Sequence, residues 1–307
     1  AGLTLLPTLS HMSSASALSD VATYPAFGRT IPTDSLRGRA LPELMLSFGW
    51  SSCVLLYRED AFGISVAGDV QKAAPAKGVS IQSFAFQPDD KASMQTAVSQ
   101  ARASELRVFA VMGSTVTDLL NFLEAADAEG IVGRAGYAVI DLYALDENGG
   151  AQATLEGASE ARRERTLELL EGMISMRITT TQGDLTGDAF NQQYSRLGLE
   201  EVNGDPEFGI HLNMTEEELR QPCSMVCRYA YDAVFAYALA WTSVRARIGV
   251  GRCPERRELL EELRGLRFEG ASGLVTFAEN GDRGDDGLFV GLYNIQSNGT
   301  LRDVEMG

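Results

Sequence analysis

The chain has 307 residues, of which 45% are hydrophobic and 22% are charged, and its formal net charge at pH 7 is −16. This length allows one large α/β domain or two smaller lobes around a sizeable buried core, and the composition is that of a folded protein. The acidic excess argues against nucleic acid as a partner, because binding to phosphates requires clustered Lys and Arg side chains.

The chain contains no segment that is expected to reach a membrane. It begins at Ala1 without a positively charged, apolar leader, so any signal peptide is expected upstream. The most apolar helix candidate, residues 229–244, carries Asp232 and is shorter than the roughly 20 apolar residues that cross a bilayer. We expect membrane attachment only through a segment outside this chain.

Residues 50–143 alternate between short apolar runs and amphipathic stretches. The runs predict strands at 53–57, 79–86, 106–112 and 137–142. The stretches between them, with apolar residues three or four apart, predict helices at 63–76, 91–104 and 115–129. Successive βα units of this kind are typical of a parallel sheet with right-handed crossovers.

A polar, Gly-rich break at residues 146–150 separates this region from the rest and predicts a lobe boundary. Beyond it we expect a strand at 172–178 and helices at 188–196, 228–247 and 254–264. Two further apolar runs, 272–277 and 287–295, flank an Asn280-Gly281 turn and predict a β-hairpin.

The cysteines and histidines do not have the spacing of a metal site. Cys53 lies in an apolar run and is expected to be a buried small hydrophobe. Cys223 or Cys227 is predicted to form a disulfide with Cys253 across one long helix, with the choice between the two left open. With only two histidines in the chain, we expect no zinc cluster.

Two N-x-S/T triplets begin at Asn213 and Asn298, and they predict glycosylation if the chain is secreted. The first triplet has a second interpretation, because Thr215 and Glu218 have the spacing of a helix capping box. Both interpretations of this segment remain open.

No motif indicates an enzyme or a cofactor. A Walker loop, a G-x-G-x-x-G after a strand and a G-x-S-x-G elbow are all absent. The cluster Asn280, Asp282, Asp285 and Asp286 has the composition of a calcium loop, but the twelfth position counted from Asp282 is Tyr293 rather than Glu. We therefore expect no catalytic residues, no metal and no cofactor.

A series of segments resembles one family in order and at similar intervals. It starts with residues 10–20 (SHMSSASALSD) and 24–35 (YPAFGRTIPTDS) and continues with the segments at 48–50, 57–63, 231–234, 268–270 and 281–283. The family is the receptor family ligand-binding region, which includes branched-chain amino-acid binding proteins, natriuretic-peptide receptor cyclases and class C G-protein-coupled receptors. The resemblance covers nearly the whole chain, and the opening part of the family's first lobe would precede Ala1.

The resemblance implies a two-lobed α/β fold of the type I periplasmic-binding-protein kind, with parallel sheets flanked by helices and an incomplete first lobe. By this pattern residues 1–33 and 146–267 belong to lobe 1, and residues 34–145 and 268–307 to lobe 2. Chain crossings are expected near Thr33, Leu145 and Phe268. Ligands of such folds bind at the carboxyl ends of the strands.

The resemblance also implies five ligand-binding residues. Ser13 and Ser14 match a loop that holds the carboxylate and amino groups of an amino acid. Asp34 matches an acidic position that faces the amino group, Phe62 an aromatic position that covers the ligand, and Asp141 a second amino contact. Four of the five residues have a structural alternative: a polar loop for the two serines, a helix N-cap for Asp34 and core packing for Phe62.

The implied function is that of an extracellular sensor domain of a membrane receptor, which closes its lobes around a small polar ligand such as an amino acid and dimerises through lobe 1. The alternatives are a substrate-binding protein of a transporter, an interaction domain with a degenerate cleft, and an α/β enzyme with an unfamiliar site. A catalytic nucleophile paired with a base would distinguish the enzyme, and the sequence offers no such pair.

Overall fold

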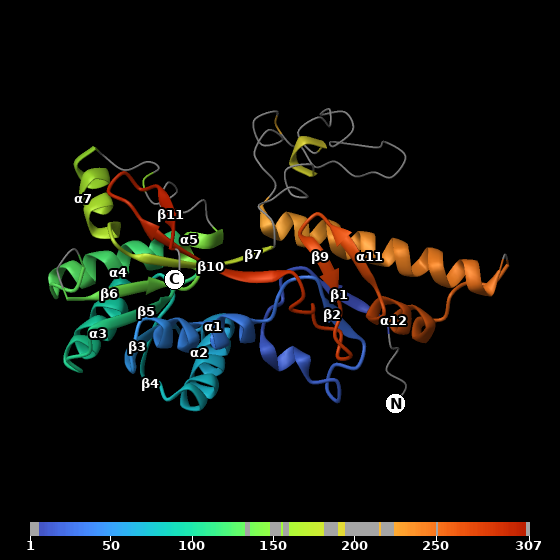
Figure 1. Cartoon of the computed structure of the whole chain (residues 1–307), viewed down its shortest axis with the longest axis horizontal. Coiled ribbons are helices and arrows are strands. Elements are labelled where there is room, and N and C mark those ends of the chain that lie inside the picture. Colours follow the sequence, from blue (N-terminus) through green and yellow to red (C-terminus); the bar gives the residue numbers. More distant parts are fainter. Residues whose placement is uncertain are drawn as a thin grey trace. The chain divides into compact units, whose positions relative to one another are not determined.

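The computed structural model describes residues 6–132, 136–147, 155, 160–180, 190–193, 215, 224–249 and 251–304. The chain forms two compact units, whose elements are labelled in Figure 1. Unit 1 consists of Ala1–Ser14, Leu18–Pro32 and Thr180–Leu288. Unit 2 consists of Ala15–Ala17, Thr33–Thr179 and Phe289–Gly307.

A seven-stranded sheet forms the centre of unit 2, in the order β11-β10-β7-β6-β5-β3-β4. The strands are β3 (Ser52–Arg58), β4 (Ser80–Phe86), β5 (Val108–Met112), β6 (Ala138–Asp141), β7 (Ile174–Thr180), β10 (Leu288–Ile295) and β11 (Leu301–Asp303). Strands β3 to β7 pair in parallel, and β10 and β11 are antiparallel. The predicted α/β class with a mostly parallel sheet is confirmed.

Helices pack on this sheet, and their starts are set by local capping. They are α1 (Asp34–Ser47), α2 (Ala61–Ala73), α3 (Lys91–Arg102), α4 (Val116–Ala128), α5 (Ala144–Glu147) and α7 (Glu160–Leu170). The side chains of Asp60, Asp90 and Thr115 accept backbone N–H groups in the first turns of α2, α3 and α4. These N-caps satisfy donors that a helix start leaves open.

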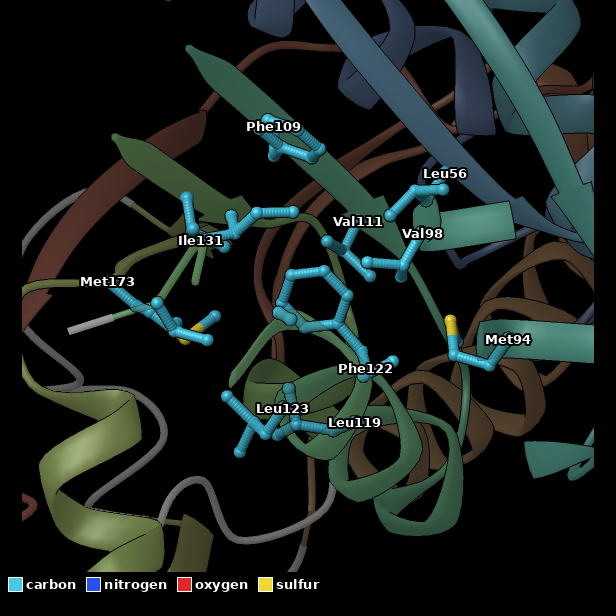
Figure 2. Packing of buried hydrophobic residues seen from close by; sticks show 14 of the residues in the cluster. Leu56, Met94, Val98, Phe109, Val111, Leu119, Phe122, Leu123, Ile131 and Met173 are labelled. Carbon is cyan, nitrogen blue, oxygen red and sulfur yellow. The ribbon is translucent and has the colours of Figure 1, made fainter. Parts of the chain in front are cut away.

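The two faces of the sheet carry separate hydrophobic clusters because side chains alternate along each strand. Val54 and Leu56 of β3 pack with residues of α3 and α4, and Figure 2 shows Phe122 of α4 in this cluster with Val111 of β5. Cys53 and Leu55 lie in the cluster that contains residues of α1 and α2. The alternation explains why both faces of β3 are apolar.

The described residues of unit 1 include two small sheets and the two helices α11 and α12. Strand β1 (Thr8–Ser10) is parallel to β2 (Phe27–Arg29), and β8 (Arg267–Gly270) is antiparallel to β9 (Gly273–Thr276). Helix α11 (Met225–Ile248) packs against α12 (Arg256–Arg264) through a cluster that includes Ala236, Ala240, Val244, Leu259 and Leu263. No described helix is long and apolar enough to cross a membrane.

The predicted hairpin of residues 272–277 and 287–295 is wrong. Strand β9 pairs with β8, whereas β10 joins the sheet of unit 2 beside β7 and β11. Asn280-Gly281 does form a turn, in which Gly281 has a φ of +88°, but the pair that closes it is Phe277 and Arg283. The turn is encoded by adjacent residues and is predicted correctly, whereas the pairing of the strands depends on residues elsewhere in the chain.

The predicted disulfide to Cys253 is also wrong, because Cys253 is free and exposed while Cys227 is disulfide-bonded. Cys227 lies in the first turn of α11 and Cys253 follows its end. At 1.5 Å per residue the helix separates them by about 30 Å, and the short return cannot close this gap. Cys53 is buried as predicted, and burial raises the pKa of its thiol to about 12.

The lobe division stays a prediction, and the compact units have other bounds than those lobes, with the longest differences in two segments. Residues 146–179 lie in unit 2 and not with lobe 1, because β7 pairs with β6 in the seven-stranded sheet. Residues 268–288 lie in unit 1, because β9 pairs with β8. Most of the predicted helix 188–196 lies outside the described residues, as do the triplet at Asn213 and its alternative capping box apart from Thr215.

Candidate functional site

Three of the predicted ligand residues lie at one edge of the sheet in unit 2. Phe62 lies in the first turn of α2, the helix after β3, and Asp141 is the last residue of β6. Asp34 begins α1, whose far end leads directly into β3. All three therefore lie at the carboxyl edge of the parallel strands, where ligands of open α/β sheets bind.

Asp34 is fully buried, with 0% of its surface exposed. It is the first residue of α1, and the N-cap is the preceding Thr33. The alternative in which Asp34 itself caps the helix is therefore wrong. An acidic side chain in the first turn is nevertheless favoured by the partial positive charge of the helix N-terminus.

Phe62 packs edge-on against Tyr143, with ring centroids 4.7 Å apart. The guanidinium carbon of Arg37 lies 4.9 Å from the centroid of the same Tyr143 ring. The Nε atom of Arg37 donates a hydrogen bond of 3.1 Å to the carbonyl of Leu142. These contacts connect α1, α2 and the residues just after β6. We call the side chains at this edge of the sheet the carboxyl-edge cluster: Arg37, Phe62 and Tyr143, which are in contact, and Asp34, Asp141 and Arg177 of β7, which lie at the same edge.

The carboxylate of Asp141 is engaged by the backbone just after it. Its oxygens accept hydrogen bonds from the N–H groups of Ala144, at 3.2 Å, and Leu145, at 3.0 Å. This is the geometry of a helix cap, and it orients the start of α5. A ligand amino group would have to share these oxygens with the backbone, so the ligand role of Asp141 stays a prediction.

The structure adds residues that sequence reasoning missed. Arg177 of β7 donates a hydrogen bond of 2.6 Å to the carbonyl of Leu145 and lies over the Tyr293 ring at 5.5 Å. Arg37 is 4% exposed and lies three residues after Asp34, on the same side of α1. That spacing is visible in the sequence, but the position of Arg177 depends on strand pairing.

In unit 1 the predicted serine loop is held by Arg29, which is fully buried. The guanidinium forms an ion pair with Asp282 at 2.7 Å and donates 2.9 Å hydrogen bonds to the carbonyl of Ser13 and the hydroxyl of Ser19. The N–H of Ser13 donates to the Ser10 hydroxyl at 3.0 Å. Ser13 is exposed and Ser14 is buried, so the loop after β1 has one accessible serine.

The described residues contain no group of three or more His, Cys, Asp or Glu side chains that could hold a metal ion. The carboxyl-edge cluster instead combines two carboxylates with two guanidinium groups and two aromatic rings. These groups can recognise a small molecule that carries charge of both signs.

Several curated proteins are similar to the chain. It is 25% identical over 297 residues to the gamma-aminobutyric acid type B receptor subunit 1 of Caenorhabditis elegans, covering 91% of this chain and 30% of that protein. It is also 25% identical to metabotropic glutamate receptor 6 of Oryctolagus cuniculus, covering 90% of this chain and 34% of the receptor. The chain thus spans about a third of the length of these relatives.

Among solved structures, an ABC transporter substrate-binding protein from Desulfitobacterium hafniense superposes with a TM-score of 0.63 at 21% identity. A second structure of that description, in complex with Leu, has a TM-score of 0.61 at 20% identity. Each match covers 96% of this chain and 72% of the other and shows a shared type I periplasmic-binding-protein-like fold.

The sequence profile described as "Receptor family ligand binding region" matches residues 1–287. Its members are ligand-binding regions of receptors and substrate-binding domains rather than enzymes. The match covers most of the chain, and the mostly parallel sheet of unit 2 agrees with the fold of such ligand-binding regions. This chain belongs to the receptor family ligand-binding region family.

Proposed function

We propose that the chain is the extracellular sensor domain of a membrane receptor, which closes its two lobes around a small polar ligand such as an amino acid. The ligand drives signalling only if it binds the closed state more tightly than the open one. Signalling proceeds in a homodimer formed through lobe 1, with the membrane reached by a segment outside this chain.

The carboxyl-edge cluster is the observation that carries this proposal. It places the buried Arg37 over Tyr143, whose ring packs on Phe62, and the buried Asp34 one turn away from Arg37 on the same helix α1. A carboxylate of the protein can bind the ammonium group of a ligand, and a guanidinium can bind its carboxylate. Aromatic rings can pack on its apolar side chain. The structurally similar substrate-binding protein was solved with Leu, a ligand of this chemistry.

Because Asp34 is fully buried, the proposal requires an open conformation in which its carboxylate meets solvent. A ligand that enters this conformation replaces the lost hydration of the carboxylate with a charge-assisted hydrogen bond. Ligand retention in the closed form then depends on that bond.

A thermal-shift screen of the 307-residue chain against amino acids and small metabolites tests the proposal, since a bound ligand raises apparent stability by mass action. We expect a saturable shift with one chemical class that carries an amino group. Asp34→Asn is expected to weaken the affinity for that ligand about 10- to 100-fold, the range for losing a hydrogen bond to a charged group.

Asp90→Asn is the matched control for Asp34→Asn. Asp90 is the exposed N-cap of α3, where Asn caps as well as Asp, so affinity should not change. Equal affinity in the wild-type and Asp34→Asn proteins would remove Asp34 from the site. A screen without any saturable shift on folded protein would contradict the sensor and favour the interaction domain.

The transporter alternative has the structural similarity to substrate-binding proteins in its favour. The two functions differ in the part of the full-length protein beyond this region: a receptor continues into a membrane span and signalling module, whereas a transport protein does not. Limited proteolysis of the native protein in membranes, with detection of this region by an antibody, would distinguish an anchored domain from a free one.

Secretion leads to a separate prediction at the second glycosylation triplet. Asn298 is exposed in the turn between β10 and β11, where its side-chain oxygen accepts hydrogen bonds from the N–H and hydroxyl of Thr300. We expect a glycan at Asn298 in protein secreted from eukaryotic cells, detected as a mass shift lost in Thr300→Val and retained in Thr300→Ser. An unmodified wild-type protein would show that the triplet at Asn298 is not a glycosylation site.

A further inference from the structure

Strand β4 (Ser80–Phe86) is an edge strand of the seven-stranded sheet in unit 2, at the opposite end of the sheet from β11 (Figure 1). It pairs in parallel with β3 on its inner side. The N–H of Ser80 donates to the carbonyl of Ser51 at 2.9 Å, and the carbonyl of Phe86 accepts from the N–H of Glu59 at 2.8 Å. Both end residues of β4 therefore direct their backbone groups toward β3.

Three residues of β4 direct their backbone groups away from the sheet. Backbone groups point to the same side at every second residue of a strand, so those of Ile81, Ser83 and Ala85 face the outer edge. These N–H and C=O groups form no hydrogen bond with any other residue that the structure describes. Such a row of unpaired groups is a template for pairing with another strand.

The two edges of the sheet differ in how they are protected. Natural edge strands are usually short, or they carry charged residues or proline, which disfavour pairing with another chain. At the other edge, β11 has three residues, which include Arg302 and Asp303. Strand β4 has seven residues and contains no charged residue, no proline and no glycine. Its own sequence therefore offers none of these protective features.

Apolar side chains on both faces of β4 remain partly exposed. Ile81 packs against the hydrophobic cluster that contains residues of α1 and α2, and Phe84 packs against the cluster that contains residues of α3 and α4. Both side chains are only partly buried, at a strand where the sheet ends. A further strand on this edge would extend both clusters and remove more apolar surface from water.

We propose that β4 pairs with β4 of a second copy of the chain, in antiparallel orientation about a two-fold axis at Ser83. In an antiparallel pair, residues whose backbone groups face each other exchange two hydrogen bonds. The outward residues are symmetric about Ser83, so Ile81 meets Ala85 of the other copy and Ser83 meets its own counterpart. A two-fold interface of this kind is self-complementary.

The charges beside β4 favour the antiparallel orientation. Lys77 precedes the strand and Asp89 follows it, each at the same number of residues from Ser83. The two-fold axis therefore brings Lys77 of one copy toward Asp89 of the other, whereas a parallel arrangement would bring like charges together. Both side chains are exposed, in ion pairs with Glu43 and Arg58 of their own copy. Because β4 itself carries no charge, the facing strands do not repel each other although the chain has a net charge of −16.

The expected dimer is reversible. Pairing of one strand with its copy is expected to bury less surface than a standard protein interface of about 1,600 Å². The interface lies in the predicted lobe 2, so it differs from the homodimer through lobe 1 and does not depend on the proposed sensor function. An extended segment of another protein is the alternative occupant of this edge.

Disulfide trapping at Ser83 tests both the pairing and its register. The variant Ser83→Cys is combined with Cys253→Ser, because Cys253 is free and exposed whereas Cys53 is buried. Facing residues of this type have Cα atoms about 5.5 Å apart, which is within the range of a disulfide. Mild oxidation of the 307-residue chain should therefore give a covalent dimer that a reductant reverses.

Ser80→Cys in the same background is the matched control. Ser80 is exposed on the same strand, but the two-fold axis places it opposite Phe86 of the other copy. The two copies of Ser80 are then about 20 Å apart, at about 3.3 Å per residue, which is too far for a disulfide. Equal cross-linking of the two variants, or no cross-linking of Ser83→Cys, would overturn the proposal.

Sedimentation equilibrium of Ala85 variants measures the same association without a cross-link. Ala85→Pro removes an outward N–H, and no hydrogen bond among the described residues is lost. We expect it to raise the dissociation constant of the dimer at least about tenfold. Ala85→Ser keeps the N–H and should associate like the wild type, and thermal melting of both variants verifies folding.

Any association through lobe 1 is common to both Ala85 variants, so the difference between them reports on β4 alone. Equal dissociation constants in Ala85→Pro and Ala85→Ser would contradict the proposal. A wild-type chain that stays monomeric at its highest soluble concentration would also overturn it, in favour of a segment of another protein as the occupant of the edge.

Discussion

Asp232→Leu is expected to lower the free energy of unfolding of unit 1 by about 3–5 kcal/mol, the range for removing one partner from a buried ionic network. Asp232 lies in α11 and is 0% exposed. Its carboxylate accepts hydrogen bonds from the N–H groups of Ala271, at 2.6 Å, and Ser272, at 3.0 Å, and from the Ser272 hydroxyl. Leucine would leave these buried donors without an acceptor.

Asp232→Leu also destabilises the buried Arg283. This residue is 2% exposed, and its guanidinium donates hydrogen bonds to the Ser272 hydroxyl at 2.6 Å and to the carbonyl of Thr30 at 2.8 Å. The network thus joins α11, the β8–β9 turn and the end of β2. Without Asp232, the guanidinium stays buried with no nearby anion to balance it in this network. The desolvation of this unpaired charge is the largest contribution to the loss of stability.

Urea unfolding monitored by hydrogen exchange of α11 amides would measure the effect in unit 1 separately from unit 2. Asp286→Leu is the control, because Asp286 forms an exposed ion pair with Arg267 at 3.1 Å and its loss should cost at most about 1 kcal/mol. Equal losses in the two variants would contradict the role assigned to the buried network.

The same residue predicts a pH dependence. Burial raises the pKa of Asp232, and the hydrogen bonds from Ser272 and Ala271 oppose this shift. Because the folded-state pKa exceeds the unfolded value, the folded protein binds more protons in the window between them. The contribution of Asp232 to stability is therefore complete below the unfolded pKa and falls as pH rises through the folded pKa. The stability difference between wild type and Asp232→Asn, measured by urea unfolding from about pH 3 upward, should show this decline.

The sheet of unit 2 could be predicted from the sequence because its signals are local. Both faces of β3 are apolar, as the run from Cys53 to Tyr57 indicated, since clusters lie on either side of it. The helices between the strands begin at side-chain caps such as Asp60 and Thr115, which are visible in the sequence. Local capping and alternation together determine these elements.

Strand partners and cross-links could not be predicted in this way. The turn at Asn280-Gly281 is encoded locally, but whether β9 pairs with β8 or β10 depends on packing against distant segments. The error over Cys253 has the same origin, because the length of α11 determines which cysteines can meet.

Some residues of the candidate site could likewise be predicted from local patterns, and others could not. Asp34, Phe62 and Asp141 all lie at the carboxyl edge because the order of βα units places the start of α1, the start of α2 and the end of β6 there. The use of Asp141 as a backbone cap and the position of Arg177 result from contacts between strands that no local pattern reveals.

Gly63→Ala is expected to destabilise unit 2 by about 3 kcal/mol, at the upper end of the cost of overpacking. A Cβ atom at this position would lie 2.1 Å from the carbonyl oxygen of Arg58, at the end of β3. The backbone cannot move away freely, because the guanidinium of Arg58 is paired with Asp60 at 2.6 Å and with Asp118 at 2.7 Å. The clash must be relieved by shifting the start of α2.

This shift also moves the neighbouring Phe62 away from Tyr143, so Gly63→Ala should weaken binding at the carboxyl-edge cluster as well. Gly68→Ala is a control in the same helix, because a Cβ there meets no atom within 4 Å. It should stabilise the protein by up to about 1 kcal/mol, as alanine does in an exposed helix interior. Thermal and urea unfolding of both variants measure the difference, and a Gly63→Ala protein as stable as Gly68→Ala would show that α2 is not held against β3 at this point.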